Sequence, residues 1–236
     1  GADSVQEQVR VQRDGPAVEQ RVGAWTGLER RHVTGGAPEG VEHQLARPHL
    51  VVNRAAADRR EHMYDSYENR SSGDRCIMGF NAGPPMRSSA YNNNVMIFQT
   101  PGYVTILNEM VHNARVIPIG DGPDLPFSQR SGVSRGRWEG ETLVIETDQF
   151  AGGSSGLTST NMHLVERLTR LDPDTVAYEY TVTDSSIYTA PYTVMMPLRR
   201  TDGPLFEYAC HEGNIGLHGI LAGARNLELL GRELRP

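Results

Sequence analysis

The chain has 236 residues, enough for one β-rich domain or at most two small domains. Its formal net charge of -6 leaves no basic field to hold the phosphates of a nucleic acid, and no apolar run reaches the roughly 18 residues that a membrane helix needs. All 23 basic residues are Arg, which excludes lysine chemistry such as Schiff-base formation.

The first part of the chain, residues 1–93, is polar and predicts an extension rich in loops and short helices that packs on the main domain, residues 94–236, as one structural unit. Residues 6–13 and 55–69 have helical character, with Ala55-Ala56-Ala57 opening the second segment. Pro84-Pro85 marks a firm break between this region and the segment that follows.

From Asn94 onward the sequence alternates between short apolar runs and turn signals, which is typical of strands and hairpins. Tight turns are expected at Thr100-Pro101-Gly102, Glu139-Gly140-Glu141 and Asp172-Pro173-Asp174. The predicted strands cover 95–98, 103–110, 114–117 (an extension of the strand before it or the next strand), two short strands on either side of the turn within 137–145, then 164–171, 175–183, 192–199 and 205–210. A closing helix is expected at 219–230.

No strand–helix alternation appears, so a parallel α/β fold is disfavoured. An antiparallel meander can remove its exposed edges by closing on itself. We therefore expect a mainly β protein whose meander closes into a barrel or half-barrel (lipocalin-like), with short helices at the termini.

Three motifs resemble those of a large uncharacterised group of bacterial proteins, many of which carry secretion signals. The segment Arg137-Trp138-Glu139-Gly140-Glu141-Thr142-Leu143-Val144 is similar to the group's GRWEGDTLVV stretch. Residues 109–117, EMVHNARVI, resemble its EYNHAFRVIY segment, and residues 162–167, MHLVER, resemble its LHVVER segment.

The resemblance spans roughly residues 95–200 and implies secretion and a β-rich fold. It also selects the polar residues within the three motifs as site candidates. The chain departs from the group where many members carry HSEA, because Thr158-Ser159-Thr160-Asn161 replaces a histidine and a carboxylate there.

The densest polar cluster in a strand-like stretch consists of Glu109, His112 and Arg115. A bulge near 111–113 would bring the three side chains together as an acid–base histidine with a carboxylate and a cationic anchor. The alternative is a Glu109–Arg115 cross-strand pair with His112 on the solvated face, as structural ion pairs often imitate active sites.

A second histidine, His163, begins a predicted strand directly after a Gly/Ser loop, and loops at barrel mouths often carry function. Strand alternation places His163 with Val165 and Arg167 on one face, and Glu166 with Leu164 and Leu168 on the other. Glu166 is therefore expected as a partner for an arginine.

Two aromatic residues complete the predicted substrate-binding set, which comprises Arg115, Tyr103, Trp138 and Glu166. Tyr103 lies on a predicted strand, where its hydroxyl could polarise a carbonyl inside a barrel. Trp138 is expected more as a core or barrel-plug residue than as a stacking platform, because large aromatic side chains dominate cores.

Metal and cofactor signals are weak. His211, Glu212 and His218 follow Cys210, but adjacent strand residues point apart and no second ligand group matches a known metal site. The chain has no GxSxG, GxGxxG, HExxH or P-loop motif, so we expect no metal and no organic cofactor.

Two functions fit these residues. We favour a cofactor-independent lyase, isomerase or cyclase that acts on a small organic substrate in a barrel pocket, with His112 and His163 exchanging a proton and Glu109 orienting one of them. The alternative is a non-catalytic, lipocalin-like binding protein for a small hydrophobic or aromatic ligand. Polar groups inside the pocket would favour the enzyme, whereas an apolar lining with solvent-facing histidines would favour the binding protein.

The cysteine pair bears on localisation. Cys76 and Cys210 could form one long-range disulfide in an oxidising compartment, or both could be reduced core residues. The first residue is Gly rather than Met, which a tag remnant or a removed signal peptide would explain. We expect a periplasmic or secreted protein.

Overall fold

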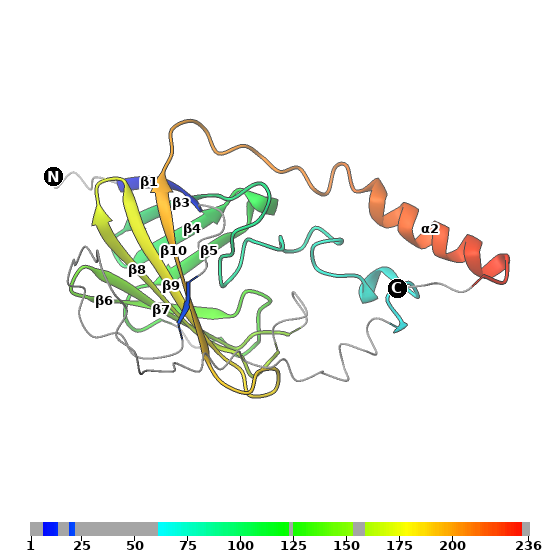
Figure 1. Cartoon of the computed structure of the whole chain (residues 1–236), viewed down its shortest axis with the longest axis horizontal. Coiled ribbons are helices and arrows are strands. Elements are labelled where there is room, and N and C mark those ends of the chain that lie inside the picture. Colours follow the sequence, from blue (N-terminus) through cyan, green and yellow to red (C-terminus); the bar gives the residue numbers. More distant parts are fainter. Residues whose placement is uncertain (1–6, 14–18, 22–60, 123–124, 153–158, 233–236) are drawn as a thin grey trace, which may run out of the picture.

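The computed structural model describes residues 7–13, 19–21, 61–122, 125–152 and 159–232. The protein is mainly β and antiparallel (Figure 1), as the sequence predicts. Its strands are β1 (Glu7–Arg13), β2 (Glu19–Arg21), β3 (Asn94–Thr100), β4 (Tyr103–Asn108), β5 (Ala114–Pro118), β6 (Val133–Glu139), β7 (Thr142–Asp148), β8 (His163–Asp172), β9 (Thr175–Thr183) and β10 (Tyr192–Arg200).

The strands form two antiparallel groups, three-stranded β3–β5 and five-stranded β6–β10. β1 pairs with both β3 and β10, which gives the order β5-β4-β3-β1-β10-β9-β8-β7-β6, and β2 pairs with β10 beside this path. At the two outer strands, one isolated bridge joins Ile119 to Gly136, and the Gly120 amide donates to the Gly136 carbonyl at 2.8 Å.

Two of the predicted hairpin turns contain a glycine with a positive φ angle. Gly102 lies between β3 and β4 with φ +80°, and Gly140 lies between β6 and β7 with φ +60°. These left-handed conformations are strained for residues with a Cβ atom, so the glycines fix where each pair of strands reverses.

The core lies between the two groups of strands and takes alternate residues from each. On β8, Leu164, Glu166 and Leu168 are buried, whereas the side chains between them face outward. The opposing group contributes Val95, Val104, Ile106 and Ile117. The alternation expected for this strand is confirmed, and it decides which polar side chains enter the interior.

Some predicted elements differ from the structure. Residues 7–13 form strand β1 rather than a helix, because the alternation of Val9 and Val11 with polar residues has the period of a strand. Residues 205–210 form no strand, since the chain leaves the sheet after β10 (Figure 1). Residues 67–69 form a short 3-10 helix, η1 (Tyr67–Asn69), and residues 55–60 lie outside the described residues. The division at residue 93 stays a prediction.

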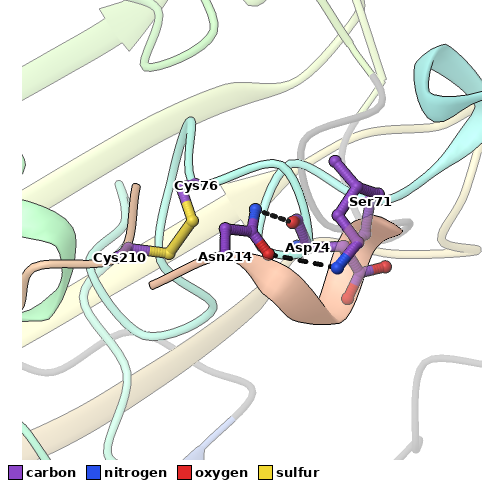
Figure 2. Close-up of a disulfide and its surroundings, with 6 residues drawn as sticks. Ser71, Asp74, Cys76, Cys210 and Asn214 are labelled. Carbon is purple, nitrogen blue, oxygen red and sulfur yellow. Dashed lines mark hydrogen bonds between the residues drawn. A yellow bond between two sulfur atoms is a disulfide. The ribbon is translucent and has the colours of Figure 1, made fainter. Parts of the chain in front are cut away.

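The C-terminal helix, α2 (Ile215–Leu229), begins earlier than predicted and lies away from the sheet (Figure 1). A disulfide joins Cys76 to Cys210, and Figure 2 shows Asn214 beside it. Asn214 caps α2 by accepting a hydrogen bond from the Leu217 amide at 3.2 Å, and its amide nitrogen donates to the Asp74 carbonyl at 2.9 Å. Of the two alternatives for the cysteines, a disulfide or two reduced core residues, the disulfide is therefore the correct one.

None of the helices in the described ranges is long and apolar enough to cross a membrane.

Removing the disulfide is expected to destabilise the whole fold. The bond closes a loop with a sequence separation of 134 residues that contains β3–β10. For the double substitution Cys76→Ser/Cys210→Ser, the chain-entropy model gives a loss of about 3 to 5 kcal/mol in the free energy of unfolding, measured by urea denaturation. The wild-type protein with reductant should match the variant, and unchanged midpoints in both would contradict the expectation.

Candidate functional site

A buried ion pair spans the interior between the two groups of strands. Arg115 on β5 contacts Glu166 on β8 through two hydrogen bonds, Nη1 to Oε2 at 2.5 Å and Nη2 to Oε1 at 3.0 Å. Glu166 is 0% exposed, and the Tyr178 hydroxyl on β9 donates to the same Oε1 at 2.6 Å. Tyr178 in turn accepts from the Met86 amide at 3.0 Å, so four segments share one polar network.

Burial and charge act together on this network. Burial disfavours the charged guanidinium, but the Glu166 carboxylate outweighs it and raises the pKa of Arg115. Burial, together with the nearby Glu166 carboxylate, raises the pKa of the Tyr178 hydroxyl well above its usual value. Arg115 therefore stays charged and Tyr178 neutral near pH 7, and both act as hydrogen-bond donors to Glu166 within this network.

The structure does not join Glu109 and His112 to this network. Both lie at the turn between β4 and β5, which contains the short 3-10 helix η2 (Met110–His112) rather than the expected bulge. Glu109 is buried, and its Oε2 accepts from the Asn94 side-chain amide at 2.7 Å. His112 is exposed, and its Nδ1 accepts from the Tyr208 amide at 3.3 Å. The Glu109–Arg115 pair, the alternative interpretation, is not formed either.

His163 lies on the outer face of β8, as strand alternation predicts, while Glu166 points inward. Its Nδ1 is 2.8 Å from Oδ1 of Asp148, and both side chains are about half exposed. The sheet separates His163 from the Arg115–Glu166 pair. The described residues therefore do not show the expected convergence of both histidines, Glu109 and Arg115 on one pocket. The expectation that Glu166 pairs with an arginine is confirmed.

Several motif residues that carry the family resemblance stabilise the outer face of the sheet. Glu139 accepts from Arg137 at 2.9 Å and from Arg167 at 3.0 Å, and Arg137 also contacts Glu146. Val144 lies opposite both arginines in the register and is fully buried although it points outward. We infer that the aliphatic parts of the two arginines cover this valine.

A cavity of about 540 Å³ opens at the end of the sheet where the β6–β7 and β8–β9 hairpins turn. Its three most buried lining residues, Val104, Leu143 and Leu168, are called the cavity floor below. Above the floor the lining consists of Ile97, Gln99, Trp138, Glu141, Arg170, Leu171, Asp172, Pro173, Asp174, Thr175, Val176 and Arg200. The cavity is thus apolar at depth and charged at its mouth.

The ion pair lies one layer of side chains beneath the cavity floor. On β8, Glu166 lies two residues before Leu168 of the floor. On β4, Ile106 lies two residues after Val104 of the floor, and Ile106 pairs with Arg115 on β5. Residues two apart on a strand share a face and lie about 6.6 Å apart. The polar network therefore supports the floor but does not line the cavity.

Of the two predicted aromatic site residues, only Trp138 lines the cavity. Its side chain is 45% exposed, so the expectation of a core residue is wrong, because Trp138 lies near the end of β6 at the mouth of the cavity. Tyr103 is 50% exposed at the β3–β4 hairpin and is not among the lining residues. The pair thus offers a natural comparison between a lining and a non-lining aromatic side chain.

Sequence reasoning missed two buried polar anchors. Tyr178 lies in none of the three motifs, and its partners come from residues far apart in the sequence. Asp184 is buried and accepts from the Ser159 hydroxyl at 2.7 Å and the Ser186 amide at 3.0 Å. Ser159 lies where the resembling group carries HSEA, so in this chain that position holds a loop in place.

No group of three or more His, Cys, Asp or Glu side chains in the described parts of the chain could hold a metal ion. His211, which precedes α2, and His218, which lies on α2, are both exposed. No protein-family model matches the chain, and neither does any curated protein or solved structure.

Breaking the ion pair from one side should destabilise the protein more than removing both charges. Arg115→Met or Glu166→Gln alone leaves a buried charge without its partner, which costs roughly 3 to 5 kcal/mol of unfolding free energy. The double substitution should cost no more than either single one, because neither charge remains. The matched control is the exposed pair Arg225–Glu228, whose coupling should stay below about 1 kcal/mol. Additive losses at Arg115 and Glu166 would contradict the network.

Alkaline pH should destabilise the fold through Tyr180. Burial raises the pKa of its hydroxyl from the usual 10 to about 12. The stability that depends on neutral Tyr180 is therefore complete below pH 10 and is lost as the pH rises toward 12. The loss from this one group is roughly 2 to 3 kcal/mol, measured by urea denaturation across that range. Tyr180→Phe should reduce the loss, and an unchanged pH profile in this variant would refute the assignment.

Proposed function

We propose that this protein binds a small molecule with an apolar or aromatic body in the cavity above Val104, Leu143 and Leu168. The observation that carries the proposal is the cavity itself. Its volume of about 540 Å³ falls within the range of small-molecule sites, roughly 300 to 1,000 Å³. An apolar depth with a few polar groups at the mouth is the usual composition of such sites.

The same geometry supports the binding protein over the lyase or isomerase. None of His112, His163 and Glu109 lines the cavity, and the buried charges of Arg115 and Glu166 are bound to each other. A general acid or base must reach the proton it transfers, about 3 Å away or through one water. Proton-transfer catalysis by His112, His163 and Glu109 stays a prediction, because none of the three lines the cavity.

The proposal includes a barrel-like closure of the sheet. The Ile119–Gly136 bridge and the Gly120 hydrogen bond bring the ends of β5 and β6 together, and the Arg115–Glu166 pair links β5 to β8 across the interior. These contacts support a half-barrel around the core with the cavity at one end, an arrangement in which small ligands are often held.

We also propose an oxidising compartment, the periplasm or the cell exterior, as the place where the protein acts. The Cys76–Cys210 disulfide supports this, because such bonds form and persist in oxidising environments and are rare in the cytosol. The resemblance of the three motifs to secreted bacterial proteins agrees with it.

The binding function is tested with the neutral probe 2-naphthylmethanol and calorimetry. Trp138→Ala should weaken binding about tenfold, because a lining aromatic side chain contributes roughly 1.4 kcal/mol of contact. Quenching of Trp138 fluorescence in a Trp25→Phe background, which removes the chain's other tryptophan, reports the same event.

The matched control is Tyr103→Ala, which removes an equally exposed aromatic side chain outside the cavity. Binding to this variant should stay within about twofold of the wild type, well under the effect of one lining contact. Equal losses in the two variants, or no probe binding to the wild type, would overturn the proposal.

A further inference from the structure

The charges at the cavity mouth fall into two sets, those already bound within the chain and those that are free. Arg170 donates to the carbonyls of Asp172 and Pro173 at 3.3 and 3.4 Å. The Asp172 carboxylate accepts from the Asp174 amide at 2.8 Å, and this hydrogen bond within the turn lowers the pKa of Asp172. Both side chains therefore stabilise the β8–β9 turn and are not available to a ligand.

Three charged side chains of the lining remain free. Within the described residues, Glu141, Asp174 and Arg200 make no side-chain hydrogen bond or ion pair. Arg200 and Asp174 lie together on one wall, because the Arg200 amide donates to the Asp174 carbonyl at 2.7 Å. Arg170, the lining arginine opposite Glu141 in the register, donates to turn carbonyls, and the Glu141 carboxylate makes no ion pair with a described residue.

Glu141 lines the same cavity as Trp138 and follows it by three residues at the β6–β7 hairpin. It occupies the tight turn between β6 and β7, and Trp138 stands at the end of β6, paired with Leu143 of the floor. Among the described residues, no arginine stacks on the Trp138 ring. A carboxylate next to a free indole face is a combination that attracts an organic cation, by charge and by the ring quadrupole.

We propose, on the basis of the proposed function, that the ligand carries a cationic group, such as an ammonium, on its apolar or aromatic body. The body occupies the space above Val104, Leu143 and Leu168, and the cation lies at the mouth between Glu141 and Trp138. The net charge of the free lining groups is negative, in keeping with this sign.

The test compares three probes that share one ring system and differ in charge: 2-naphthylmethylammonium, neutral 2-naphthylmethanol and anionic 2-naphthoate. The cation should bind about threefold to tenfold more tightly than the neutral alcohol, the scale of a partly exposed ion pair with a cation–π contact. The anion should bind most weakly. Raising the salt from about 20 mM to about 500 mM should reduce the preference, because the mouth is open to solvent.

Glu141→Gln should lower the affinity for the ammonium probe about threefold to fivefold and leave the affinity for the alcohol unchanged. The control is Glu212→Gln, which makes the same charge change at an exposed residue outside the cavity and should alter neither probe. Equal binding of all three probes, or tightest binding of the anion, would overturn the cation assignment while the proposed function stands. Failure of every probe to bind would overturn both.

Discussion

The ion pair between Arg115 and Glu166 is the contact on which the arrangement of the two groups of strands depends. It joins β5 to β8 across an interior filled largely by apolar side chains, and Tyr178 and the Met86 amide complete its hydrogen bonds. A buried charge is tolerated only when its partner and its hydrogen bonds are all present. Any relative displacement of the two groups would break this set, so the pair specifies how they face each other.

The position of that pair also shapes the cavity. The layer above the pair consists of Val104, Leu143 and Leu168, which seal the charges from the open end of the sheet. A ligand therefore meets an apolar surface at depth and charged side chains only at the mouth. This separation of the buried network from the cavity is why the geometry supports binding, although the sequence alone slightly favours proton transfer.

The motifs that suggest a family serve mainly to hold the structure together. Arg137, Glu139 and Arg167 form ion pairs on the outer face, and Arg115 and Glu166 form the interior pair. Charged residues that recur in a pattern can thus mark either a site or a structural network, and their burial and partners distinguish the two. Trp138 is the motif residue that reaches the cavity, because it lies at the open end of its strand.

The sequence by itself determined the strands and turns from β3 to β10 and the inward direction of Glu166, because strand alternation and turn glycines are local properties of the chain. β1 is a strand where the sequence predicts a helix, because seven residues with two valines carry little periodic signal. Only the tertiary structure decided which residues share a site. Arg115 and Glu166 lie 51 positions apart in the sequence, and Tyr178 and Met86 lie 92 positions apart, so no local pattern links either pair. His112 and His163 looked like partners in sequence, yet each meets a different neighbour because a tight turn exposes the first and strand alternation turns the second outward.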